Sequence, residues 1–329
     1  MPRLSCFARA LAPAVLSVVV ASTALAAGAH DTTAADAGAL LALDCDNLAG
    51  IDAAERMKGL PAPRIVNLHG SVPIVTMQPF AEFLIGMGYP ESSLRDPFDG
   101  SLTHSSFADS EELAGALAWY YERDGMRPML VGHSQGGMMV VRTLHELAGG
   151  FHDQVPVFDP ATRTAQPRTS VSDPFTGRDR AVVGVEVAFA AAIATGKLPR
   201  ILLGQWTMIP KLRKVPDVAL EFTGFAIAWD PIAGNVGDGD PYVATGTSVV
   251  RNVLLPATYS HIGAPITEHL AAQRATRAWV LAWRPDGPAA APPRDADLRN
   301  LELAADLWYS IRRHWCLEGQ RRLRLLGPA

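Results

Sequence analysis

The stretch Met129–Gly137 reads MLVGHSQGG, and it constrains the fold of this chain more than any other segment. A short apolar run leads into Ser134, which stands among glycines, and a second apolar run of helical length follows until Gly149. A chain that passes from strand to helix through so short a turn brings its own backbone close together, so the flanking positions must be small. We therefore predict a strand over 129–131, a sharp turn at Ser134 and a helix over 135–148.

The serine in this turn is suited to nucleophilic chemistry. A hydroxyl is a weak nucleophile near neutral pH, and it must be exposed, oriented and deprotonated in order to react. The helix that begins at Gln135 directs its N-terminal amides and the positive end of its dipole toward charge that develops near the serine. The residues Gly132-His133-Ser134-Gln135-Gly136 match the G-x-S-x-G nucleophile elbow. The alternative is a glycine-rich turn in which the serine is incidental.

The motif and its strand–turn–helix context resemble the α/β-hydrolase superfamily, and within it the secreted serine lipases and esterases. The resemblance covers about residues 64–283 and implies an α/β fold, with a mainly parallel sheet flanked by helices. It also gives a role to His69-Gly70-Ser71, which follows a strand expected over 64–68. In such enzymes a His-Gly turn supplies one amide of the oxyanion hole, here that of Ser71. The residue after the nucleophile, here Gln135, supplies the other.

The resemblance also places an acid and a base after the serine, in that order along the chain. His261 lies in a loop between an apolar strand and a long helix, where the family carries its catalytic histidine. Asp230 ends an apolar strand and is expected to orient the imidazole and stabilise its charged form. Asp238 and Asp240, in the loop that follows, are the alternative acids. The other histidines after the serine are His145, His152, His269 and His314.

Alternating strand and helix patterns predict a parallel sheet that is covered on both faces. The apolar run 182–193 fits a buried strand or a buried helix, and its periodicity does not decide between them. Further strands are expected over 222–229 and 249–255. Helices are expected over 36–59, 80–87, 110–123 with Asp109 as N-cap, 267–283 and 298–313.

The segment over about 151–215, which precedes the strand that carries the acid, is long. In the enzymes that this chain resembles, such an insert forms a cap over the site. The side chains that would form its apolar underside are Leu202, Leu203, Trp206, Met208, Ile209 and Leu212. The alternative is ordinary core packing. A cap of this kind implies a substrate with an acyl chain or another apolar part.

Residues 1–26 have the layout of a secretory signal peptide. Two arginines precede an apolar, alanine-rich run that ends in the small-x-small pattern Ala24-Leu25-Ala26. The alternative is an uncleaved membrane anchor. We expect the mature protein to be secreted or periplasmic, without stable insertion into a membrane. It would consist of a catalytic domain over 27–284, then a linker and a helical extension over 285–329.

Two cysteines remain after removal of the signal peptide, and export would place them where disulfides form. Cys45 and Cys316 are an even pair in an oxidising compartment, so we expect a disulfide that joins the two ends of the mature domain. The alternative is two free buried thiols.

Composition excludes several classes of function. The formal net charge of -4, or -6 without the signal peptide, and the absence of a basic stripe argue against nucleic-acid binding. The sequence has no HExxH, no Cys/His cluster and no phosphate loop, so we expect no metal and no other cofactor. The expected function is hydrolysis of small-molecule or lipid carboxylic esters through an acyl-serine intermediate. The alternatives are an acyltransferase and a binding protein that keeps the fold without the chemistry.

Overall fold

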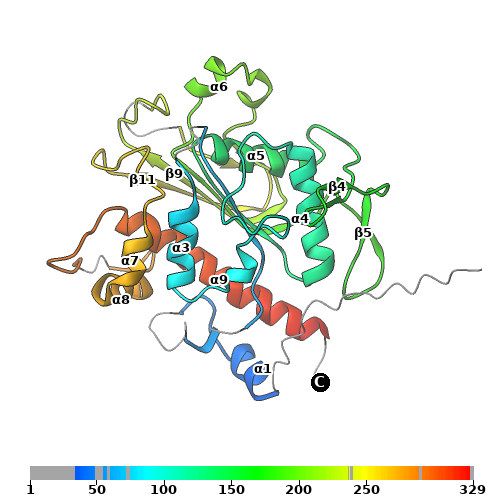
Figure 1. Ribbon diagram of the computed structural model, residues 1–329, viewed down its shortest axis with the longest axis horizontal. Coiled ribbons are helices and arrows are strands. Elements are labelled where there is room, and N and C mark those ends of the chain that lie inside the picture. The colour runs from blue at the N-terminus through cyan, green and yellow to red at the C-terminus, as the bar shows by residue number, and fades with distance from the viewer. Residues whose placement is uncertain are drawn as a thin grey trace, which may run out of the picture.

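The computed structural model describes residues 34–48, 55–57, 60–71, 75–235, 237, 240–288 and 291–326. The expected signal peptide lies outside these ranges. A five-stranded sheet in which all neighbouring strands are parallel forms the centre, in the order β1-β2-β7-β9-β11. Figure 1 shows helices on both sides of this sheet. The strands are β1 (Ile65–Leu68), β2 (Met129–His133), β7 (Val187–Ile193), β9 (Ala219–Ile227) and β11 (Val249–Leu255). The predicted α/β class is therefore confirmed.

Alternate side chains of the strands enter two separate apolar cores. Met129 and Val131 belong to the first core and Leu130 to the second, as the two-residue period of a strand requires. The first core is covered by α3 (Gln78–Gly86), α7 (Glu268–Ala272), α8 (Arg274–Ala282) and α9 (Leu301–Leu326). The second is covered by α4 (Ser110–Asp124) and α5 (Gln135–Leu147).

The smaller elements lie in the connections between these strands and helices. They are α1 (Ala34–Leu41), η1 (Glu91–Ser93), β3 (Phe158–Asp159), β4 (Thr164–Ala165), β5 (Ser170–Ser172), β6 (Asp179–Ala181), α6 (Leu198–Leu202), η2 (Trp206–Met208), β8 (Lys214–Val215) and β10 (Val243–Ala244). In the described part of the chain, no strand of the central sheet precedes Ile65. At the outer edge of β1, Leu68 forms an isolated parallel β-bridge with His104.

Local signals set the ends of α4 as predicted. The Asp109 carboxylate accepts a hydrogen bond of 2.9 Å from the Glu111 amide, and so it satisfies one of the free amides of the first turn. Gly125 ends the helix with a φ of 65°, a left-handed conformation that favours glycine.

The insert expected over 151–215 is not one segment, because β7 divides it. The apolar run 182–193 contains this strand, which lies between β2 and β9 and is buried along its whole length. Two small hairpins, β3–β4 and β5–β6, precede β7 and pack beside α4, whereas α6 and η2 follow it. The second part, residues 194–215, directly follows the carboxyl end of β7, and its Arg200 contacts Gln135.

Three predicted helices differ from the structure by more than one or two residues at their ends. Of the helix expected over 36–59, α1 ends at Leu41, where the Gln320 amide donates to the carbonyls of Leu40 and Leu43 and the chain turns toward Cys45. Residues 55–57 are also helical, and residues 49–54 and 58–59 lie outside the described part of the chain. The helix expected over 267–283 is two helices, separated by the extended backbone of Gln273. The helix expected over 298–313 is 26 residues long and ends at Leu326.

The predicted disulfide is confirmed. Cys45 and Cys316 are bonded, with a Cα–Cα distance of 5.6 Å and a sequence separation of 271. Cys316 lies within α9, so the bond fixes this helix to the segment that follows α1. Of the helices in the described ranges, none combines the length and the apolar character that a membrane crossing requires.

Candidate active site

The three residues of the expected triad meet at the carboxyl edge of the sheet. Ser134 directly follows β2, Asp230 follows the end of β9, and His261 lies in the loop after β11. His261 Nδ1 lies 2.6 Å from an Asp230 carboxylate oxygen, and His261 Nε2 lies 3.0 Å from Ser134 Oγ. One imidazole therefore connects a hydroxyl and a carboxylate that are far apart in the sequence.

The backbone at Ser134 is strained in the way that the glycines predict. Ser134 has a φ of 54° and a ψ of -111°, which non-glycine residues seldom adopt. A Cβ on Gly132 would lie 2.3 Å from the carbonyl carbon of Gly136, and a Cβ on Gly136 would lie 2.1 Å from the Leu68 carbonyl oxygen. Both positions therefore exclude any larger residue, and they allow the turn that orients the hydroxyl.

Asp230 is buried, and its two oxygens have separate partners. One oxygen contacts His261, while the other accepts backbone hydrogen bonds from Ile232 and Ala233 at 3.0 and 3.1 Å. Burial alone would raise the pKa of Asp230, but the hydrogen bonds from His261 and from these amides outweigh it and lower the pKa. Asp230 is therefore a carboxylate at neutral pH, and it favours the Nδ1–H tautomer of His261, which leaves Nε2 free to accept a proton.

His133 has a contact that the sequence did not predict. Its Nε2 lies 2.7 Å from the backbone carbonyl of His261, and the ring is 1% exposed. Burial, together with the nearby His261, lowers the pKa of His133 to about 3, so the ring is neutral and donates from Nε2. A ring with so low a pKa is poorly suited to act as the general base. The side chain instead holds the loop that carries His261.

The His-Gly turn lies against the nucleophile. A Cβ on Gly70 would lie 3.5 Å from the Ser134 Cβ, so the two turns are in contact. The His69 amide donates to the His104 carbonyl at 3.1 Å, and Ser106 Oγ donates to the Gly70 carbonyl at 3.3 Å. Ser71 follows as a half-buried residue, immediately before the undescribed positions 72–74.

Gln135 is the first residue of α5, so its amide is among the four that have no acceptor within the helix. Its side chain is 1% exposed, and the side-chain oxygen accepts a hydrogen bond from Arg200, which lies on α6. The residue after the nucleophile is therefore fixed both through the helix and through the segment that follows β7.

The other candidate acids and bases lie elsewhere. Asp240 forms ion pairs with Lys197 and Arg213, and Asp238 lies outside the described residues. His145 Nε2 faces the carbonyls of Lys211 and Lys214. The remaining histidines, His152, His269 and His314, face the carboxylates of Glu146, Asp297 and Glu221, respectively.

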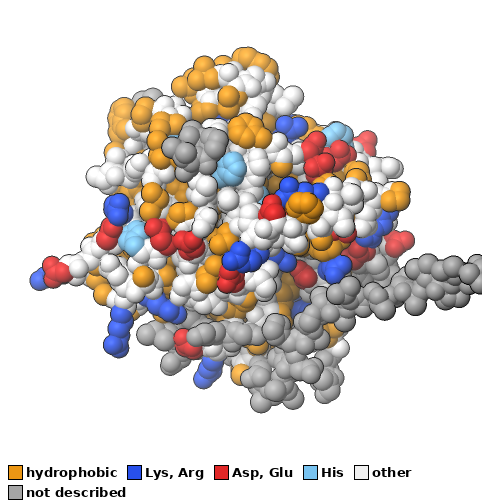
Figure 2. All heavy atoms as spheres, in the orientation of Figure 1, with side chains coloured by type: hydrophobic (Ala, Val, Ile, Leu, Met, Phe, Trp, Pro, Cys, Tyr) orange, Lys and Arg blue, Asp and Glu red, His pale blue; other side chains and the backbone are white. Residues whose placement is uncertain are grey.

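Five of the six side chains expected on the apolar underside of the cap fall into two groups, and the sixth, Ile209, is half-buried. Met208 and Leu212 are fully buried in the second core, as the packing alternative requires. Leu202, Leu203 and Trp206 are 76%, 50% and 61% exposed. In Figure 2 hydrophobic side chains gather over α6, at the top of the view. The outer surface of α6 and η2 is therefore apolar.

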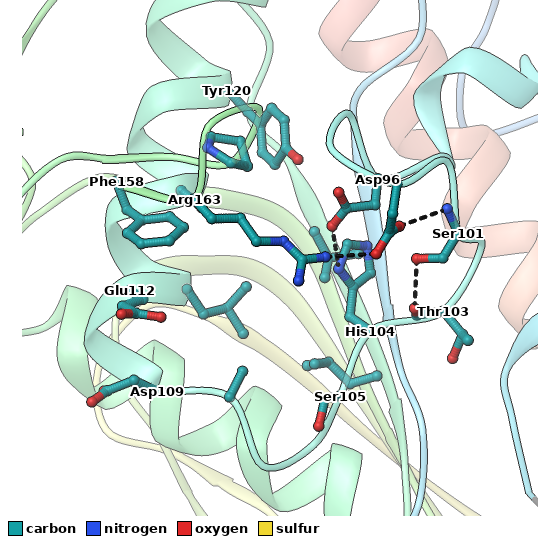
Figure 3. A pocket seen from close by; sticks show the side chains of 17 residues that line it. Asp96, Ser101, Thr103, His104, Ser105, Asp109, Glu112, Tyr120, Phe158 and Arg163 are labelled. Atoms are coloured by element: carbon teal, nitrogen blue, oxygen red, sulfur yellow. Dashed lines mark hydrogen bonds and ion pairs between the residues drawn. The ribbon is translucent and has the colours of Figure 1, made fainter. Parts of the chain in front are cut away.

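A separate pocket of about 360 Å³ lies beside β1, between the loop of residues 96–105 and α4. Figure 3 shows Arg163 reaching across it from the side of Phe158, and its guanidinium pairs with Asp99 at 2.6 Å. Asp96 Oδ2 lies 3.3 Å from His104 Nδ1. Burial raises the pKa of Asp96, but hydrogen bonds from His104 and the Phe98 amide outweigh it and lower the pKa to about 2. Ser134 does not line this pocket, but Leu68 and His104 do, and these two residues also contact the elbow glycine Gly136 and the His-Gly turn, respectively.

Comparison of the chain with protein-family models, curated proteins and solved structures gives no match. The α/β architecture and the geometry above are therefore the basis for assigning a function. Among the described residues, no group of three or more His, Cys, Asp or Glu side chains is arranged to hold a metal ion.

Proposed function

We propose that this chain is a carboxylic ester hydrolase with an α/β-hydrolase fold, acting through an acyl-serine intermediate. The observation that carries the proposal is the continuous hydrogen-bonded path from Ser134 Oγ through His261 to Asp230. A strained serine at the start of a helix, in contact with a His-Gly turn, supports it independently.

In the proposed first half-reaction, Ser134 Oγ attacks the ester carbonyl while His261 Nε2 accepts its proton. Asp230 stabilises the imidazolium that forms. The amides of Gln135 and Ser71 bind the oxyanion of the tetrahedral intermediate. His261 then gives its proton to the departing alcohol, and the acyl group remains on Ser134. In the second half-reaction His261 takes a proton from a water molecule, which attacks the acyl-serine. The bond between the acyl carbon and Ser134 Oγ then breaks, Oγ takes the proton back from His261, and the acid leaves.

The exposed apolar surface of α6 and η2 supports an ester with an acyl chain or another apolar part as the substrate. The disulfide supports an oxidising compartment, so we propose that the protein acts outside the cytoplasm.

The proposal is tested with p-nitrophenyl esters of increasing acyl length. We expect Ser134→Ala to lower kcat by a factor on the order of 10⁴ or more, because the nucleophile is lost while the buried core is unchanged. Circular dichroism provides the control for folding, and a fluorophosphonate probe should label only the wild type. Turnover of the Ser134→Ala variant at the wild-type rate would exclude the mechanism. Transfer of the acyl group to an added alcohol in preference to water would instead identify an acyltransferase.

A further inference from the structure

Arg200 is a buried cation next to the nucleophile elbow. It lies on α6 and is 1% exposed, and its Nη1 donates to the side-chain oxygens of Gln135 and Gln205. Its Nε has no hydrogen-bond partner, and no carboxylate of the described residues pairs with it. The neighbouring Lys197 and Arg213 differ in this respect, because both pair with Asp240.

A buried charge with only neutral partners is costly for a protein. Leaving water lowers the pKa of Arg200 to about 10, so the guanidinium is still protonated at neutral pH. Buried cations are ordinarily accompanied by an anion, and the described residues supply none to Arg200. An anion arises beside Gln135 during the proposed reaction, when the carbonyl oxygen of the substrate becomes an oxyanion.

We infer that Arg200 is a positioning residue for the oxyanion: it holds Gln135 in place and leaves its own positive charge uncompensated until the tetrahedral intermediate forms. This inference rests on the proposed function. An interaction accelerates a reaction only if it is stronger in the transition state than in the ground state. The charge of Arg200 meets this requirement, because it gains a negative partner only when the oxyanion forms. The guanidinium acts through Gln135 and through its field, which a buried setting screens less than water does.

Two substitutions of Arg200 separate its charge from its hydrogen bonds. Arg200→Gln keeps a donor and removes the charge, and Arg200→Lys keeps the charge. With a neutral p-nitrophenyl ester we expect Arg200→Gln to lower kcat about tenfold with KM within about twofold, since a field that acts through Gln135 is weaker than a direct oxyanion donor. Arg200→Lys should recover most of the loss. Arg95→Gln, which removes an arginine from an exposed pair with Glu91, is the matched control.

A second pair of variants changes the charge without altering Arg200. Gln135→Glu keeps the backbone amide of residue 135 and gives Arg200 a carboxylate partner, so kcat should fall although a new ion pair forms. Gln135→Met is the control that removes the side-chain oxygen and adds no charge. We expect Gln135→Met to retain at least several times the kcat of Gln135→Glu.

A boronic acid provides a readout that does not depend on turnover, because it is trigonal and neutral in solution and becomes a tetrahedral anion when it bonds to Ser134 Oγ. Its affinity should fall about as much as kcat in Arg200→Gln and in Gln135→Glu, and it should be retained in Arg200→Lys. Arg200→Lys with no advantage over Arg200→Gln would overturn the inference, as would a raised KM with unchanged kcat. A wild type without Ser134-dependent turnover or boronate binding would instead reject the proposed function.

Discussion

The carboxyl edge of the sheet and the layer formed by α9 are built in opposite ways. At the edge, Ser134 and Trp229 have positive φ values of 54° and 57°, and the triad depends on single hydrogen bonds between loops. In the α9 layer, a continuous helix buries Trp308 and Trp315 almost completely and is fixed by a disulfide. Strained backbone persists only where the surrounding structure determines it, and at Ser134 the close packing of Gly132 and Gly136 provides this constraint.

The α9 layer also contains a buried ionic cluster around Glu221. This carboxylate, which lies on β9, accepts from Ser310 at 2.6 Å and contacts His314 at 3.1 Å and Arg313 at 3.2 Å, all on α9. Arg251 links Glu221 to Asp306 of the same helix. Changes in this cluster should alter stability, whereas changes at the triad should alter turnover, and the following substitutions test that division.

The largest expected effect is that of Asp230→Asn. The amide cannot stabilise an imidazolium and favours the wrong tautomer of His261, so kcat should fall by a factor on the order of 10³ to 10⁴. Thermal unfolding followed by circular dichroism should change little. A variant with normal turnover would show that Asp230 caps its own turn and does not serve His261.

Cys45→Ser should lower the free energy of unfolding by about 4 kcal/mol, because the bond closes a very long loop and restricts the unfolded chain. Chemical denaturation of this variant and of the wild type measures the loss, and reduction of the wild type should reproduce it. The kcat under native conditions should stay close to the wild-type value. A large fall in kcat with unchanged stability would contradict the division between the two regions.

Glu221 should make the free energy of unfolding depend on pH in the acid range. Burial raises the pKa of Glu221, but hydrogen bonds from His314 and Ser310, together with the charges of His314 and Arg251, outweigh it and lower the pKa from its ordinary 4.5 to about 2. The stabilisation is therefore complete above about pH 4.5 and is lost as the pH falls toward 2, and it amounts to about 3 kcal/mol. Urea unfolding between pH 5 and pH 2 should show a weaker pH dependence in Glu221→Gln. Equal slopes in both proteins would contradict the prediction.

The smallest expected effect is that of His133→Phe. The substitution keeps a ring in the same place and removes the donor to the His261 carbonyl, so we expect kcat to fall about tenfold through misplacement of the base. His133→Gln, which retains a side-chain donor, should lose less. An unchanged kcat in both variants would show that the loop of His261 does not need this bond.

Local patterns predicted the parts of this molecule that depend on local chemistry. The turn at Ser134, the N-cap at Asp109 and the exact span of β11 follow from residues adjacent in sequence. The triad geometry was expected from a resemblance, and each of its hydrogen bonds joins residues more than 30 positions apart.

The features that were left open, predicted wrongly or missed have non-local causes. Residues 182–193 are mostly apolar, so their sequence fits a buried strand and a buried helix equally well. The chain forms a strand here because it pairs with β2 and β9. The first helix stops at Leu41 because a glutamine from α9, about 280 positions away, binds its last carbonyls. The contacts of His133 with His261 and of Arg200 with Gln135 have no sequence signal, because each partner is defined only by the folded chain.

The bond between Cys45 and Cys316 has a consequence for synthesis. Its second sulfur belongs to α9, so a chain that stops before residue 316 leaves Cys45 without its partner. Only a chain made through α9 can close the ring. Shortened products remain open and have lost much of the layer that buries Trp308 and Trp315, which makes them better targets for proteases.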